Sequence, residues 1–139
     1  NQGLSTNNWL FKVDKDGTIL TNQIFGGSSS DSGREIINTT DGGYLVGGHS
    51  FSNDSGLTSN GAGDVWLMKF NSDDEIVWQT NFGGSENDYP HSLLELEDGF
   101  MIVCGSFSYD GDITNNNGVF DAILLKLNQS GDIQWQKNY

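Results

Sequence analysis

Hydrophobic residues occur in short runs along this chain, separated by segments rich in Gly, Asn, Asp and Ser. Residues 76–82 alternate apolar and polar positions, which is typical of a strand with one exposed face. Residues 44–50 are almost continuously apolar apart from glycine, which favours a strand buried on both faces. No run has the 3.6-residue spacing of an amphipathic helix. The pattern therefore predicts an all-β fold of short strands joined by tight turns.

The chain repeats itself with a period of about 57 residues. Residues 9–13, with the sequence Trp-Leu-Phe-Lys-Val, correspond to residues 66–70 and 123–127, and each copy has a lysine at its fourth position. The sequence Phe-Gly-Gly-Ser begins at Phe25 and again at Phe82. Because a fixed period of this length is a signature of repeat architectures, we interpret each copy as one structural unit.

Each complete unit is predicted to contain four strands. The first two strands of a unit are joined by an Asp-Gly turn, which is a strong signal for a β-hairpin. In the two complete units the strands are predicted at residues 33–39, 44–50, 65–70 and 76–82, and at residues 90–96, 100–106, 122–127 and 133–139. A half unit precedes them and has only the third and fourth strands, at residues 9–13 and 19–25.

Units of four antiparallel strands at a period of roughly 40 to 60 residues are typical of β-propeller blades. We therefore predict an incomplete β-propeller of about two and a half blades, with a partial blade at residues 1–25 and full blades at 26–82 and 83–139. An open stack or a β-sandwich of the same hairpins is the alternative. Because propellers close with typically four to eight blades, the chain is expected to be a segment of a larger protein or to assemble with copies of itself. The edge of residues 9–13 that faces away from residues 19–25 is expected to be unpaired.

Charge and composition narrow the classes of partner. The 139 residues include 6 basic and 19 acidic side chains, for a net charge of -13, so a nucleic-acid partner is not expected. No apolar run approaches the roughly 20 residues of a membrane span, and membrane insertion is not expected. The single cysteine, Cys104, lies in an apolar run and is interpreted as a small buried hydrophobe.

The loops that follow residues 44–50 and 100–106 are the best candidates for metal chemistry. They are rich in oxygen ligands, and glycine allows the sharp bends that Ca²⁺ loops use. On this basis Asp54, Asp110 and Asp112 are candidate Ca²⁺ ligands, although no complete Ca²⁺-loop motif is present. The competing interpretation is a solvated loop of Asx turns. No cofactor is predicted to be required.

Three aromatic residues lie outside the positions that recur as core and are candidates for contact with a glycan or another ligand. They are Phe51, Tyr89 and Tyr109. The recurring lysines have a different interpretation, in which each aliphatic stem packs and the ammonium meets a carboxylate. The carboxylates considered for these lysines (Lys12, Lys69 and Lys126) are Asp14, Asp64 and Asp121.

Catalysis is not predicted, because the chain has no nucleophile elbow, metal triad or Cys-His arrangement. A non-catalytic structural or interaction module is the favoured function. A glycan- or ligand-binding propeller is the alternative, and a fragment of a secreted hydrolase is less favoured.

Two segments resemble a repeat of secreted proteins from Bacteroidota. They are residues 39–48, and residues 64–70 followed by residues 76–85. Those proteins typically carry a C-terminal sorting domain for the type IX secretion system. The resemblance implies a propeller-like module at the extracellular or outer-membrane surface, whose partners are other blades of the parent protein or neighbouring surface proteins. This chain departs from the pattern at Thr21, which stands where the later copies have Trp78 and Trp135, and the sorting domain is not in the sequence.

Overall fold

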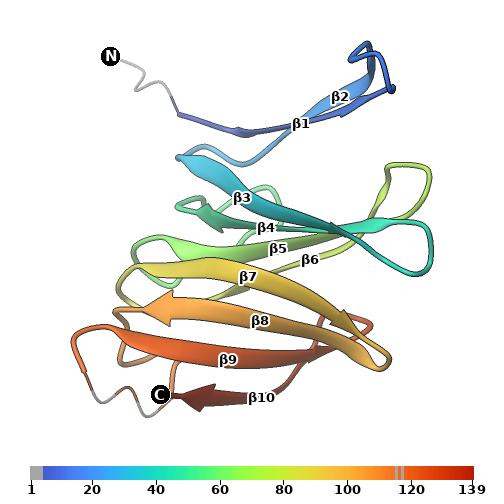
Figure 1. The fold of residues 1–139 in the computed structure, drawn as a ribbon. Coiled ribbons are helices and arrows are strands. Elements are labelled where there is room, and N and C mark those ends of the chain that lie inside the picture. The colour runs from blue at the N-terminus through green and yellow to red at the C-terminus, as the bar shows by residue number, and fades with distance from the viewer. Residues whose placement is uncertain (1–4, 115, 117) are drawn as a thin grey trace.

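All regular structure in the computed structural model is β-strand (Figure 1). The structure describes residues 5–114, 116 and 118–139. These residues form no helix that could span a membrane. The strands of this described part are β1 (Asn8–Val13), β2 (Ile19–Phe25), β3 (Asp31–Asn38), β4 (Tyr44–Ser50), β5 (Asp64–Phe70), β6 (Ile76–Phe82), β7 (Asp88–Leu96), β8 (Gly99–Ser106), β9 (Asp121–Asn128) and β10 (Ile133–Asn138).

The strands form three antiparallel sheets, counted over the described residues. The N-terminal sheet pairs β1 with β2, the central sheet has the order β3-β4-β5-β6, and the C-terminal sheet has the order β7-β8-β9-β10. Each strand pairs with its neighbour in sequence, so every sheet is a meander. Figure 1 shows the sheets stacked in chain order, with the N-terminal sheet at one end of the stack and the C-terminal sheet at the other.

The predicted all-β class and the four-stranded antiparallel units are confirmed. The predicted second and third strands of each complete unit are the central strands of a sheet, and the fourth strand lies at an edge. The bounds of β2, β4 and β6 agree with the sequence prediction, and the other strands differ from it by at most two residues at an end. Closure into a propeller, and the division of the chain into blades, stay predictions.

The central sheet buries both of its faces, and the alternation along β5 shows how. Val65 and Leu67 pack toward the C-terminal sheet, in a cluster that includes Phe100 and Leu125. Trp66, Met68 and Phe70 point to the opposite face, where Leu10 and Phe25 of the N-terminal sheet cover them. Because successive side chains of a strand point to opposite faces, one strand supplies both cores.

Cys104 is buried as expected, at 1 % exposure in the core between the central and C-terminal sheets. Burial raises the pKa of its thiol to about 12. A thiol with a raised pKa is a weak nucleophile, so Cys104 behaves as a core hydrophobe.

The two buried lysines pair with carboxylates that the sequence analysis did not choose. Lys69 Nζ lies 2.8 Å from Asp41 Oδ2, and Lys126 Nζ lies 2.6 Å from Asp98 Oδ1. Packing of the stems was predicted correctly, but the proposed partners were wrong. The reason is geometric, because Lys69 Nζ passes over Gly43, where a Cβ would lie 2.9 Å from it, to reach the β3–β4 turn. The hydrogen bond from Lys69 holds the pKa of Asp41 well below its usual range.

Candidate functional site

Strand β1 has a partner on only one edge within the described residues, as the sequence predicted. Its equivalents β5 and β9 each pair on both sides, whereas β1 pairs with β2 alone. Trp9 is 58 % exposed and Phe11 50 %, while the equivalent Trp66 and Met68 are 1 % and 0 % exposed. An unpaired edge beside exposed apolar side chains is a site at which another β-strand can pair.

Lys12 is more exposed than its equivalents Lys69 and Lys126 and has a different carboxylate partner. The β3–β4 and β7–β8 turns supply the carboxylates of Lys69 and Lys126, but among residues 5–114, 116 and 118–139 no equivalent turn lies beside β1. The Lys12 side chain is 55 % exposed, and its ammonium lies 3.4 Å from Asp74 Oδ1, in the β5–β6 turn of the next sheet.

A groove with a volume of about 230 Å³ lies between the N-terminal and central sheets. Its lining includes Leu10, Thr21, Ile36, Tyr44, Ser72 and Asp74. The Asp74 carboxylate accepts long hydrogen bonds, 3.3 Å each, from the hydroxyls of Thr21 and Tyr44. Burial, together with the charge of Asp74, raises the pKa of Tyr44 to about 12. The groove therefore combines apolar side chains with a polar part in which the Asp74 carboxylate is paired with Lys12.

The candidate Ca²⁺ ligands hold the backbone that connects successive sheets. The backbone N–H of Ser28 donates to Asp54 Oδ1 at 2.9 Å, and that of Ser85 donates to Asp110 Oδ1 at 2.7 Å. Asp112 accepts a longer bond, 3.4 Å, from the backbone N–H of Gly83. Asp54 thus serves one connection, whereas Asp110 and Asp112 serve the next. In the described residues no group of three or more His, Cys, Asp or Glu side chains could hold a metal ion.

A second network at these connections was missed by the sequence analysis. Asp31 Oδ2 accepts hydrogen bonds from the backbone of Gly27 at 2.8 Å and from the Ser52 hydroxyl at 2.9 Å. In the next unit Asp88 Oδ2 accepts the equivalent bonds from Gly84 at 2.9 Å and Ser108 at 2.8 Å. The available signal was a Ser-Phe-Ser-x-Asp sequence that recurs at residues 50–54 and 106–110.

Two fully buried carboxylates meet at the second connection. A Cβ on Gly83 would lie 2.5 Å from Asp64 Oδ1 and 2.7 Å from Asp88 Oδ2, so both carboxylates contact this glycine. Burial is the main cause that raises the pKa of Asp64 to about 6, and it also raises the pKa of Asp88. At the equivalent Gly26, the residues in these two places are Asn7 and Asp31, so one carboxylate is replaced by a neutral amide.

Two of the three candidate ligand-binding aromatics come together around His49. Its ring centroid lies 4.6 Å from that of Phe51 and 4.4 Å from that of Tyr89, and the Arg34 guanidinium lies 5.1 Å from the Tyr89 centroid. Burial lowers the pKa of His49. Tyr109 is on the β8–β9 connection and is 59 % exposed.

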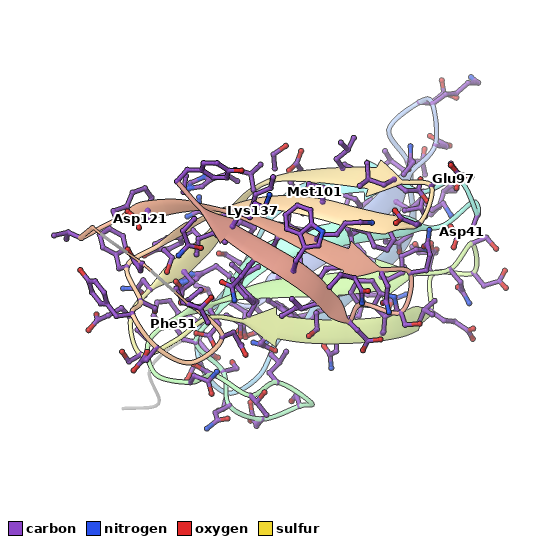
Figure 2. The ribbon with its side chains drawn as sticks, turned by 90° about the horizontal axis from the view of Figure 1, so that it is seen from below. Asp41, Phe51, Glu97, Met101, Asp121 and Lys137 are labelled. Atoms are coloured by element: carbon purple, nitrogen blue, oxygen red, sulfur yellow. The ribbon has the colours of Figure 1, made fainter. Side chains whose placement is uncertain are left out.

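The two ends of the strands carry different chemistry. Figure 2 shows Asp41 and Glu97, which mark the hairpin turns, at one end of the molecule and Phe51 and Asp121 at the other. The groove shares the end with the hairpin turns, because Gly42 and Gly43 of the β3–β4 turn also line it. The His49 cluster and the candidate Ca²⁺ ligands belong to the connections at the opposite end.

No family model matches this chain, and no curated protein matches it. The likeness to the Bacteroidota repeats therefore stays a prediction from residues 39–48, 64–70 and 76–85.

Proposed function

We propose that the chain is a non-catalytic structural and interaction module whose sheets are blades of a β-propeller in a larger assembly at the extracellular or outer-membrane surface. The meander order of the sheets and their stacking in chain order support this proposal. Its location is proposed from the sequence resemblance alone.

The unpaired edge of β1 is the observation that carries the proposal. In the central sheet, β4 occupies the corresponding edge of β5, with Gly47 opposite Leu67 and Gly48 opposite Trp66. The β3–β4 turn then places Asp41 beside Lys69. The partner proposed for β1 is therefore a β-hairpin of the same kind, with small residues opposite the aromatic position and an acidic residue in its turn. Such a hairpin belongs to another blade or to a neighbouring protein.

A peptide that spans residues 29–52 contains β3, β4 and their turn, and tests the proposal when it is added to the full chain. We expect it to shift the backbone amide NMR signals of β1, because it supplies main-chain partners along the free edge. A peptide with Asp41→Asn is the matched control, and it should bind more weakly because it cannot pair its turn with Lys12.

Peptide binding that leaves the β1 signals unchanged, or no binding at millimolar peptide, contradicts the proposed use of this edge. Equal binding of the two peptides contradicts the pairing with Lys12. A concentration-dependent dimer of the chain alone, with shifts confined to β1, would identify a second copy as the partner.

A glycan-binding role is the second candidate, favoured by the contacts of Phe51 and Tyr89 with His49. Phe51 is 42 % exposed, so its ring is available to stack on a sugar. Titration of the full chain with a panel of oligosaccharides, followed through the signals of these rings, tests it. Phe51→Ala should remove any binding, whereas Phe107→Ala, at the equivalent place in the next unit, should not.

A further inference from the structure

Trp78 shows what occupies the space between two successive sheets of this chain. It projects from β6 toward the C-terminal sheet, where its ring centroid lies 5.9 Å from that of Phe100. Its indole Nε1–H donates to the backbone carbonyl of Gln129 at 3.0 Å. The ring lies against Gly131, on which a Cβ would come within 2.8 Å of it. An indole therefore fills this interface, with an acceptor for its N–H and a glycine beneath it.

The preceding interface has different residues at every one of these places. The repeat offset puts Thr21 in the place of Trp78, Tyr44 in that of Phe100, and Asp74 in that of Gly131. Ser72 takes the place of Gln129. These four residues line the groove of about 230 Å³ between the N-terminal and central sheets. The groove is thus found where the side chain of Trp78 is missing.

Two of these replacements, Asp74 for Gly131 and Tyr44 for Phe100, give the groove its polar groups. Asp74 has a φ of 65°, in the left-handed region that its equivalent Gly131 occupies with a φ of 85°. Aspartate is one of the few residues other than glycine that adopts this region, so the turn keeps its shape and gains a carboxylate. The hydroxyl of Tyr44, absent from Phe100, donates to this carboxylate at 3.3 Å. The two side chains that stand in place of Gly131 and Phe100 therefore interact with one another.

We propose that this groove binds a planar aromatic ring of indole size that carries an N–H donor. The bound ring packs edge-to-face against Tyr44, as Trp78 does against Phe100, but is displaced from the Trp78 position because Asp74 has a Cβ where Gly131 has none. Its N–H donates to the backbone carbonyl of Ser72. The volume is sufficient, since apolar cavities of about 150 Å³ accept benzene. A free small molecule and a tryptophan side chain of a partner protein share this chemistry. The proposal is independent of propeller closure and of the β1 edge.

Titration of the 139-residue chain with indole, followed by NMR, tests the proposal. We expect shifts at the backbone amides of Thr21, Tyr44 and Asp74. The probe 1-methylindole has the same ring without the N–H, and we expect it to bind about three- to tenfold more weakly through loss of one hydrogen bond. Tighter binding of N-acetyl-tryptophanamide than of indole points to a protein side chain, and the reverse points to a small molecule.

Thr21→Trp places the residue of the other units in the groove, where the Cβ of Asp74, absent from Gly131, displaces the ring from the Trp78 position. It is expected to fill the groove, raise Tm by about 4 °C through added apolar burial and abolish the indole shifts. Thr21→Leu fills only part of the groove and should weaken indole binding severalfold, which keeps the test open if the tryptophan variant misfolds. Asn22→Trp is the matched control, because it adds an indole to the opposite face of the same strand and should leave binding unchanged.

Three results would overturn the proposal. One is the absence of shifts at the groove with millimolar indole, and another is shifts that map elsewhere on the chain. The third is unchanged indole binding by Thr21→Trp, or by Thr21→Leu if the tryptophan variant does not fold.

Discussion

The two interfaces between sheets are built from one repeated sequence, yet one is closed and the other is open. Trp78, Phe100 and Gly131 pack together between the central and C-terminal sheets. Between the N-terminal and central sheets the same places leave a groove. A repeat therefore specifies how its sheets stack, whereas single substitutions within it decide whether an interface is filled or can accept a ligand.

The strands β1 and β5 give the second part of the comparison. They have nearly the same sequence, but Trp9 is 58 % exposed and Trp66 is 1 % exposed. The difference lies in what covers each face, since Leu10 and Phe25 of the N-terminal sheet pack on the Trp66 face of β5, whereas no other sheet of the described residues lies on the Trp9 face of β1. Burial in this fold thus depends on a neighbouring sheet stacked on the face, and β1 additionally lacks a strand on one edge within the described residues.

The largest expected effect is the contrast between Trp66→Ala and Trp9→Ala. The first removes a fully buried side chain and should cost about 3–5 kcal/mol of unfolding free energy through lost burial and a cavity. The second should cost less than about 1 kcal/mol, because the exposed Trp9 loses little burial. Urea denaturation of both variants measures the difference. Equal costs would mean that Trp9 is as buried as Trp66, which would remove the contrast between the strands.

The next contrast compares the ion pairs of the complete and incomplete units. Asp41→Asn leaves the ammonium of Lys69, which is 4 % exposed, without its carboxylate and should destabilise the chain by about 1–2 kcal/mol. Lys12→Met removes the equivalent lysine at a side chain that is 55 % exposed, and should change stability by less than about 0.5 kcal/mol. Denaturation in low and high salt checks both variants, and a larger effect for Lys12→Met would contradict the account.

The carboxylates at Gly83 predict a pH dependence that Gly26 lacks. Because the pKa of Asp64 is raised from 3.8 to about 6, the folded state binds this proton more tightly than the unfolded state, so stability from this group falls as the pH rises between those values. Asp64→Asn should therefore stabilise the chain at pH 7, by about 1 kcal/mol, and have little effect near pH 4. Thermal denaturation from pH 4 to pH 7 measures the difference between variant and wild type.

A matched control makes the reverse exchange, from asparagine to aspartate, at the equivalent position beside Gly26. Asn7→Asp creates a carboxylate beside Asp31, but residue 7 is exposed, so the expected loss of stability at pH 7 is smaller. A stability difference between Asp64→Asn and wild type that does not change with pH would show that the Asp64 pKa is not raised in the folded state.

The smallest expected effect concerns the reactivity of a cysteine in the filled interface compared with one on the exposed outer face of β1. Cys104 is 1 % exposed and its pKa is raised to about 12, so an alkylating reagent should modify it only as fast as the core unfolds. A cysteine introduced by Phe11→Cys, in a Cys104→Ala background, should react at once because Phe11 is 50 % exposed. Mass spectrometry of timed samples compares the two rates of labelling. Prompt labelling of Cys104 would show that the interface between the central and C-terminal sheets opens without unfolding.

The strands could be predicted from the sequence because the repeat places each apolar run two or three times. A single run such as residues 133–138 is weak evidence for a strand by itself. Its agreement with residues 76–81 at the repeat offset made the strand prediction firm. The unpaired edge of β1 was predictable for the same reason, since its half unit lacks the first two strands. The continuous apolar run of residues 44–50 and the alternation of residues 76–82 likewise indicated which strands lie at the centre of a sheet and which at its edge.

The candidate site was harder to predict, because its contacts join segments far apart in the chain. Asp41 reaches Lys69 across 28 residues, whereas the carboxylates chosen from the sequence lay close to each lysine along the chain. Thr21 was recognised as a departure from the repeat, but only the structure joins it to Asp74 and to the groove. The aspartates in the connections resemble metal ligands by composition, and whether Ca²⁺ binds them stays a prediction.

Backbone hydrogen exchange of β1 and β5 in the full chain, with and without the peptide of residues 29–52, tests the central claim that the N-terminal sheet is an incomplete copy of the others. A two-stranded sheet is marginally stable, so the account predicts that amides of β1 exchange orders of magnitude faster than those of β5. Added peptide should slow exchange in β1 and leave β5 unchanged. Equal protection of the two strands without peptide, or a peptide that protects neither edge of β1, would contradict the account.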